Sequence, residues 1–356
     1  MTKKSNFLKN LLTTASVLAV TASAGSAMAN NARVITGAAT QAGANMDNTG
    51  ANVPVVADST ITFRGAHTYD VGGGNAVNLA AINVEANQAT LDATAAGANF
   101  SIGSITRTPN SASTLTINLD NATTITLTSA GTAAKAYIAR VANPAPQDWT
   151  FAAGNNDYTG LGNVNFNNAN DKLVINSGAT LNGNFNGAGA NEGIIEVNAA
   201  NVVFNGFIGD TKAIGTLDIK AGNSATLAKT GDNKIDAVLI GDGSTFNIAA
   251  GANIASATID SDAANKGILR FAGNSTAAIT KLGDANSLDT AEIGNGTVDF
   301  STTTDYKATK THLTGANSVI QFSAANATSE TDFTTAINGE GKLIFAHNHE
   351  LKGNIG

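Results

Sequence analysis

The sequence predicts an all-β protein built as a parallel β-helix, in which short strands stack coil upon coil into a solenoid. Three observations lead to this fold class: a repeat of long period, short runs that alternate apolar and polar residues, and a composition suited to strands and turns. Stacking accounts for all three, because a single strand-turn unit cannot cover its own apolar face and buries it only against neighbouring units. A β-sandwich array is the runner-up architecture.

A five-residue phrase occurs three times at a spacing of 74 residues, as Gly193–Val197, Gly267–Phe271 and Gly341–Phe345. The match continues outside the phrase, since Gly209-Asp210 recurs as Gly283-Asp284 at the same spacing. A unit of this length predicts about three coils of roughly 25 residues. The mature chain would then form about 13 coils, a rod roughly 60 Å long at the 4.8 Å spacing of strands.

The glycine that opens each copy of the phrase is expected to mark an equivalent turn, and the apolar residues after it are expected to face the core. Runs such as Leu115–Leu119, Leu173–Ile175 and Phe246–Ile248 alternate apolar and polar residues, which is typical of strands with one buried face. Asn, Thr and Ser at equivalent turns are expected to stack in side-chain ladders.

The composition excludes simple disorder and disfavours a helical protein. Charged residues make up 13% of the chain, against roughly 25% in ordinary domains, while apolar residues reach 42%. Gly occurs 37 times and Pro four times, and Thr, Val, Ile and Phe alternate with Asn, Asp, Ser and Gly as in short strands and tight turns. There is no cysteine, so stability must come from a continuous core and not from disulfides.

The N-terminal segment 1–29 resembles a secretory signal peptide. Its parts are a basic segment with Lys3, Lys4 and Lys9, an apolar segment over 11–24, and a cleavage site at Ala27, Ala29 and Asn30. A transmembrane anchor would need about 20 apolar residues, and this segment is shorter. Cleavage leaves 17 basic and 27 acidic residues, a net charge of −10. An acidic chain without a basic cluster is a poor nucleic-acid binder.

Three regions are predicted: the signal peptide at 1–29, an N-terminal β-rich region at 30–148, and a repetitive solenoid at 149–356. The boundary rests on residues 132–148, where alanines around Ile138 predict one or two helical turns and Pro144 stops them. Trp149 follows, the single Trp of the chain. It is expected to be a core or cap residue, and a ligand platform is the alternative.

No catalytic, cofactor-binding or metal-binding residue is predicted. The four histidines are His67, His312, His347 and His349. His347 and His349 could share one face of a strand, but a zinc site needs three or four ligands, so an exposed pair is expected. The Asp residues beside glycines are expected to cap their own backbone turns; these are Asp210, Asp232, Asp242 and Asp284. Paired carboxylates for glycoside cleavage stay open as an alternative.

Several strings of the sequence are similar to a known family. These are 50–55 (Gly-Ala-Asn-Val-Pro-Val), 159–166 (Thr-Gly-Leu-Gly-Asn-Val-Asn-Phe), and the ending Gly-Asn-Ile-Gly at 353–356 after a Gly-Lys-Leu-Ile-Phe phrase. Together with the export signal they resemble the N-terminal passenger part of the rickettsial outer membrane protein B-like surface cell antigen autotransporters. The resemblance runs diffusely over most of the chain.

The resemblance implies an exported, non-enzymatic passenger with an adhesive or surface-layer role. The chain would pass the periplasm to the outer membrane or cell surface, with host-cell surface proteins as possible partners, possible self-association, and no nucleic acid or cofactor. Such autotransporters carry a C-terminal β-barrel translocator. None is expected in this chain, so it is interpreted as a truncated passenger whose membrane contact needs a barrel from elsewhere. A secreted β-helix enzyme acting on polysaccharide and a non-functional split-gene product are the alternatives.

Overall fold

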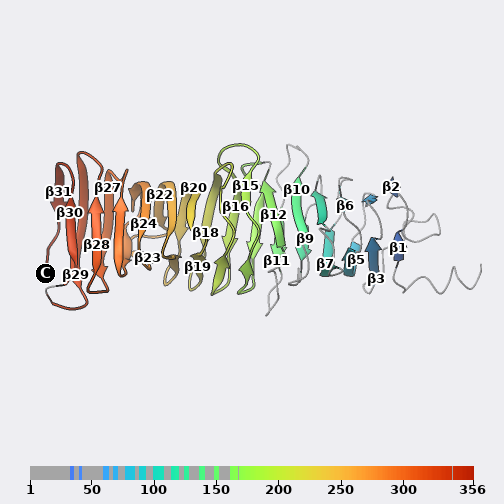
Figure 1. The fold of residues 1–356 in the computed structure, drawn as a ribbon, viewed down its shortest axis with the longest axis horizontal. Helices are drawn as coiled ribbons and strands as arrows, with labels where there is room; N and C mark the ends of the chain where they lie inside the picture. Colours follow the sequence, from blue (N-terminus) through green and yellow to red (C-terminus); the bar gives the residue numbers. More distant parts are fainter. Residues whose placement is uncertain are drawn as a thin grey trace, which may run out of the picture.

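The computed structural model describes residues 168–338 and 340–356 throughout, and before residue 168 only the residues of the strands. The described residues form strands and turns without a helix, and the strands stack into a long rod (Figure 1). Every pairing between described strands is parallel, which confirms the parallel β-helix. The β-sandwich alternative is wrong, because face-to-face sandwiches are built from antiparallel sheets.

Three ladders of strands run along the rod, and we call them the first, second and third faces. The first face contains β1 (Arg33–Ile35), β3 (Ser59–Phe63), β5 (Val77–Val84), β7 (Asn99–Arg107), β9 (Thr124–Leu127), β11 (Asp148–Phe151), β13 (Lys172–Ile175), β16 (Glu192–Val197) and β18 (Ile214–Ile219). The second contains β14 (Thr180–Leu181), β17 (Val202–Phe204), β19 (Ser224–Leu227), β21 (Thr245–Ile248), β23 (Lys266–Phe271) and β25 (Leu288–Ile293).

The third face contains β2 (Thr40–Gln41), β4 (His67–Asp70), β6 (Gln88–Ala93), β8 (Thr114–Leu119), β10 (Ala136–Arg140), β12 (Leu161–Phe166), β15 (Phe185–Gly187), β26 (Gly296–Phe300), β28 (Ser318–Phe322) and β30 (Lys342–Phe345). Five longer strands bend across a corner. From the third face to the first run β20 (Gly231–Ile240), β22 (Ala252–Ser261) and β24 (Ser275–Leu282). From the first to the second run β27 (Asp305–Leu313) and β29 (Ala327–Thr335), while β31 (His349–Lys352) lies on the first face.

The length of one coil follows from successive partners on the first face. Leu173, Ile195, Leu217 and Val238 pair in turn. Hydrogen bonds between neighbouring coils have the same spacing, with partners 22 positions apart at Asn198 and Asn176. The ladder continues through Ile259, Leu282, Tyr306, Ser329 and Leu351, so nine coils follow one another from Leu173. They make about 40 Å of rod at 4.8 Å per coil. The coil length expected from the sequence is therefore too long.

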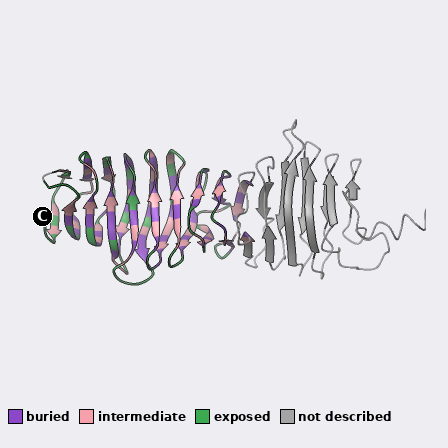
Figure 2. Ribbon diagram, turned by 90° about the horizontal axis from the view of Figure 1, so that it is seen from below, coloured by how far each residue is buried: buried purple, intermediate pink, exposed green. Residues whose placement is uncertain are grey.

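The core fills the inside of the rod with the inward side chains of all three faces. In β16, for example, Ile195 and Val197 are fully buried while Ile194 and Glu196 point outward and are half-buried. The alternation is visible as buried and partly exposed bands along the strands (Figure 2). Large inward rings include Phe185 and Phe246, which are fully buried. Each such side chain contributes about 1.5–3 kcal/mol through burial.

The three copies of the repeated phrase lie on three different faces. The first copy forms β16 on the first face, the second forms β23 on the second face, and the third forms β30 on the third face. The period of the repeat is therefore not a whole number of coils but about three and a third. The expectation of three coils per repeat is corrected: the repeated unit turns by one face each time it recurs.

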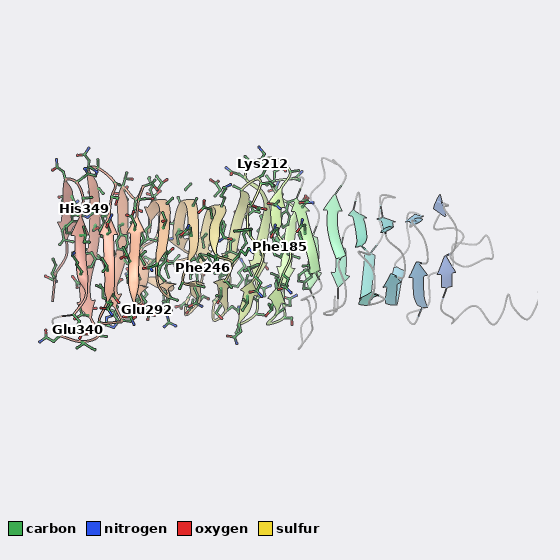
Figure 3. The ribbon with its side chains drawn as sticks, in the orientation of Figure 1. Phe185, Lys212, Phe246, Glu292, Glu340 and His349 are labelled. Carbon is green, nitrogen blue, oxygen red and sulfur yellow. The ribbon has the colours of Figure 1, made fainter. Side chains whose placement is uncertain are left out.

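The position of the widest corner moves from one edge of the rod to the next with each repeat. From one inward residue to the next, the corner spans ten residues between Phe185 and Ile195, between Ile259 and Leu269, and between Phe333 and Leu343. These wide corners join third to first, first to second, and second to third faces. Lys212, on a wide turn after the first copy, and Glu340, beside the third, lie at opposite edges of the rod (Figure 3). Wide turns thus project from successive edges.

The opening glycine of each copy has one backbone conformation on all three faces. Gly193, Gly267 and Gly341 have φ of 86°, 70° and 88°, which confirms that the turns are equivalent in conformation although not in position. Each glycine packs against the inward side chain that ends a strand of the previous coil. These side chains are Phe166, Ile240 and Leu313, respectively. A Cβ on Gly267 would lie 2.7 Å from Cγ2 of Ile240, so both φ and the lack of space require glycine here.

Substitution of Gly267 by Ala should destabilise the rod by the sum of two effects. The left-handed backbone costs about 1–2 kcal/mol with a Cβ, and overpacking against Ile240 costs about 1–3 kcal/mol more. Gly243 is the matched control, because its φ is 66° but no atom lies within 4 Å of its Cβ position. Thermal unfolding should show a larger loss for Gly267→Ala than for Gly243→Ala; equal losses would contradict the close-packing explanation.

The predicted helical turns near residue 138 are wrong where the structure describes them. Residues 136–140 form strand β10, which pairs in parallel with β8 on one side and β12 on the other. Both neighbours satisfy its backbone, so tertiary pairing overrides the local preference of alanine for helix. The first face also runs from β9 through β11 to β13 across residues 148 and 149. The division into regions at that point stays a prediction.

Candidate functional site

Several residues singled out from the sequence lie outside the described residues. These include the cleavage site at Ala27, Ala29 and Asn30. Trp149 is described only as a backbone position of β11, paired with Ile125 and Leu173. In the part of the chain that is described, no three His, Cys, Asp or Glu side chains gather as metal ligands. No helix within that part is long and apolar enough to cross a membrane.

The two C-terminal histidines differ in their surroundings. His347 is exposed as expected, but His349 is half-buried, with ring centroids 4.8 Å from Phe322 and 4.4 Å from Phe345. Its Nε2 lies 2.7 Å from the hydroxyl oxygen of Ser329. Burial lowers the pKa of His349. The expected exposed pair is therefore corrected to one exposed ring and one ring stacked on aromatic side chains.

The Asp residues beside glycines bind side chains and not their own backbone turns. Asp210 accepts from Asn184, Asp232 accepts from Asn253, Asp242 accepts from Lys266, and Asp284 accepts from Lys281, at 2.9–3.2 Å. Three of these four bonds join neighbouring coils, with partners 21 to 26 residues apart. The prediction of self-capping turns is wrong because the next coil, only about 4.8 Å away, offers donors at the same height.

Asn side chains stack in ladders along the edges of the rod, as predicted. Asn198 donates to the side-chain oxygen of Asn176 at 3.2 Å, and Asn205 donates to that of Asn182 at 3.1 Å. Charged side chains form similar pairs between coils, among them Lys172 with Glu196 at 3.5 Å. These contacts lie at the surface, where each contributes about 0–1 kcal/mol. They give the surface a polar, regular pattern.

Two wide turns are capped by equivalent side chains of the preceding coil. Oδ1 of Asn186 accepts from the backbone N–H of Thr211 at 3.1 Å, and Oδ1 of Asp260 accepts from that of Ala285 at 3.2 Å. Asn186 and Asp260 are one period of the repeat apart, and so are Thr211 and Ala285. Burial raises the pKa of Asp260, although the backbone N–H groups of the turn oppose this. One repeat thus uses a neutral cap and the other an acidic one.

Substitution of Asp260 by Asn should raise the melting temperature at neutral pH. The raised pKa means that the folded state disfavours the charged carboxylate, and Asn186 shows that an amide serves the same turn. Because the folded pKa lies above the unfolded one, the protein with Asp260 gains stability as pH falls through that folded pKa. The advantage of Asp260→Asn should therefore shrink towards pH 3.8, the ordinary pKa of the group. A lower melting temperature at pH 7 would contradict this.

A polar groove of about 420 Å³ lies at the corner between the first and second faces, and we call it the corner groove. It forms because the corner is wide in one coil and narrow in the next two: nine positions lead from Leu282 to Ala291, but five from Tyr306 to Thr311 and four from Ser329 to Phe333. The wide turn overhangs the narrow corners. The lining is Ala264, Asn265, Gly283, Asp284, Ala285, Ser287, Lys307, Ala308, Thr309, Glu330, Thr331, Asp332, Lys352 and Gly353.

The wall of the corner groove is fixed by hydrogen bonds that tie three coils together. The side-chain oxygen of Asn265 accepts from the hydroxyl of Ser287 at 2.6 Å and from that of Thr309 at 3.0 Å. Asn265 and Thr309 are 44 residues apart, two coils along the rod. The groove could not be found in the sequence, because its lining combines short segments of five successive coils that share no motif.

The strands and the groove together define a class of protein: a rod-shaped parallel β-solenoid with a polar surface. Within that class, the chain is 32% identical over 212 residues to Outer membrane protein A of Rickettsia rickettsii, a match that covers 58% of this chain and 9% of that protein. It is 33% identical over 178 residues to Outer membrane protein A of Rickettsia conorii (strain ATCC VR-613 / Malish 7), covering 48% of this chain and 8% of that one.

The chain spans less than a tenth of the length of these curated relatives. No family model matches the chain, and no solved structure matches it. The expected likeness to rickettsial outer membrane proteins is confirmed at that level. The two relatives named above are both protein A, so the finer resemblance to protein B-like antigens stays a prediction.

Proposed function

We propose that the chain is an exported surface passenger with a structural or adhesive, non-enzymatic role. The observation that carries the proposal is the similarity to two proteins named as rickettsial outer membrane proteins. The rod supports the proposal, because stacked coils of a solenoid present their edges and turns over a long, continuous surface. The predicted signal peptide supplies the first step of export, through the periplasm.

The adhesive role would use the polar edges of the rod, with host-cell surface proteins as the partners. Successive copies of the repeat present their wide turns at successive edges. A partner lying along a single edge would therefore meet equivalent wide turns only once in about ten coils. Avidity needs several binding sites within reach of one partner. Equivalent wide turns are too far apart along one edge to provide it.

Display is tested by expressing the chain in a Gram-negative host, with and without a separately supplied translocator. The mature N-terminus should be Asn30 by N-terminal sequencing, and trypsin added to intact cells should cut at Lys212, which is exposed on a wide turn. A Lys212→Gln variant controls for cleavage elsewhere. Retention of the uncleaved leader, or protection of Lys212 when the translocator is present, would count against surface display.

Self-association of the chain of residues 30–356 is part of the same proposal. Ile337, Phe345 and Ile355 are large apolar side chains that are 55%, 38% and 67% exposed. Sedimentation of the purified chain should show oligomers that grow with concentration, and Phe345→Lys should reduce them; a monomer at all concentrations would refute this part.

A further inference from the structure

We propose that the corner groove binds an uncharged, hydroxyl-rich saccharide segment. The inference deepens the adhesive role proposed above and rests on it for its biological meaning, but binding by the purified chain is measured independently of display. The volume of about 420 Å³ lies in the range of small-ligand sites, roughly 300–1,000 Å³. Its lining runs over five successive coils, so the groove extends along the rod and suits a linear ligand.

The lining of the corner groove excludes ligands that bind by burying apolar surface. Its apolar side chains are three alanines, Ala264, Ala285 and Ala308, and no aromatic or branched aliphatic side chain lines it. Hydrophobic binding scales with the apolar area removed from water, and methyl groups offer little of it. Lipids, aromatic compounds and apolar peptide side chains therefore find no anchor. The ligand must be held by hydrogen bonds.

The charges in the groove nearly cancel, which disfavours a strongly charged ligand. Three of its five charged side chains have partners nearby: Asp284 with Lys281 at 3.0 Å, Asp332 with Asn354 at 2.9 Å, and Lys352 with Glu350 at 3.6 Å. The ion pairs of the described residues include neither Lys307 nor Glu330. The ammonium of Lys307 and the carboxylate of Glu330 offset each other, and Asp332, whose partner Asn354 is uncharged, leaves the groove with a net charge of −1.

Lys307 and Glu330 offer a donor and an acceptor side by side. The two residues are direct partners in neighbouring coils of β27 and β29, whose strands lie about 4.8 Å apart. The NH2 group of Asn265 adds donors, because its oxygen is already occupied by Ser287 and Thr309. A sugar hydroxyl both donates and accepts, so neighbouring hydroxyls can satisfy the ammonium and the carboxylate together. Few other uncharged ligands present such a dense series of hydroxyls.

The equivalent corner of the first repeat lacks this combination, which makes it an internal comparison. Lys234 takes the place of Lys307, since each packs under the glycine of a Gly-Asp turn. The ammonium of Lys234 donates to the backbone oxygen of Asp210 at 3.2 Å and is occupied. The partner of Lys234 in the next coil is Ala255, where the second repeat has Glu330. The equivalent corner of the first repeat therefore has no such donor–acceptor pair, and the pair is not required to form the fold.

The test is a titration of the purified chain of residues 30–356, followed by backbone NMR, with maltotriose, cellotriose and N,N′-diacetylchitobiose as neutral probes. Sialyllactose is the charged probe, and a Lys- and Glu-containing peptide is the peptide probe. At least one neutral saccharide should bind with a Kd on the order of 1 mM, and the shifts should centre on Asn265, Thr309 and Glu330. Glu330→Ala and Lys307→Ala should each weaken binding roughly tenfold, the loss of one hydrogen bond to a charged group.

The matched control is the pair Lys172 and Glu196, which also joins neighbouring coils but lies outside the groove. Lys172→Ala and Glu196→Ala should leave the Kd unchanged. Equal binding by wild type and Glu330→Ala, or binding of sialyllactose or the peptide in preference to every neutral saccharide, would overturn the proposal. So would the absence of shifts in the groove with all three neutral probes at about ten times the expected Kd. Loss of display with saccharide binding intact would instead count against the proposed function alone.

Discussion

Removal of residues 193–266 is expected to leave a folded rod, shorter by about three and a third coils or roughly 16 Å. The deletion takes out one period and joins Glu192 to Gly267, which restores the phrase at the junction. Leu269 then takes the place of Ile195 on the first face, and every later strand moves by one face. The fold should accept this because each face is a parallel ladder with the same inward pattern. Circular dichroism and small-angle scattering measure the strand content and the length.

The shift of faces has its own measurement, made possible by the lack of cysteine in the chain. Val174 is the partner of Glu196 on the first face, whereas Arg270 lies on the second face beside Asn247. In the deletion, Arg270 should replace Glu196 beside Val174. Cysteines at 174 and 270 should then form a disulfide in the deleted chain and not in the full one, since a disulfide needs Cα atoms within about 7 Å.

Removal of one residue more, 193–267, is the matched control for the deletion. It takes away the glycine that the turn requires and shifts the following strand by one position. Such a slip points the inward side chains outward, because successive residues in a strand face opposite sides. The control should therefore lose cooperative unfolding. If both deletions fold equally well, or if neither folds, the interchange of faces is wrong.

Substitution of Phe322 by Ala is expected to destabilise the rod by about 3–5 kcal/mol. The ring is 1% exposed and stacks between Phe300 and Phe345, with centroids at 5.5 and 5.7 Å, while Tyr306 meets it edge-on at 5.2 Å. Its removal leaves a cavity between the rings of Phe300 and Phe345, which belong to the two neighbouring coils. The adjacent outward residue provides the control, and Gln321→Ala should change stability by less than about 1 kcal/mol.

The effect of Phe322→Ala should also be local along the rod. Each coil of a solenoid contacts only its neighbours, so stability is approximately a sum of nearest-neighbour contributions. Amide hydrogen exchange should accelerate most in β26, β28 and β30 and least near β13. A uniform loss of protection from β13 to β31 would show that the rod unfolds as one unit and would contradict this expectation.

Much of the fold was predictable because the residue pattern that marks each strand and turn lies within a few neighbouring residues. The alternation in runs such as Leu173–Ile175 indicates the buried face directly, and the glycine of each repeated phrase indicates a turn that excludes a Cβ. Local reasoning failed at residues 136–140, where neighbouring strands on both sides convert an alanine-rich segment into β10. It also failed for the turn aspartates, whose partners lie a coil away in space and 21 to 26 residues away in the chain.

The sequence by itself determined that this protein is an all-β solenoid with a repeat of long period and a polar, weakly charged surface. Only the tertiary structure decided how that period relates to the coil, because the length of a coil depends on how three faces pack around one core. It also decided where the corner groove lies. Asn265 and Thr309 meet there across 44 residues, since two turns of the chain bring them within hydrogen-bond distance and no local pattern records that contact.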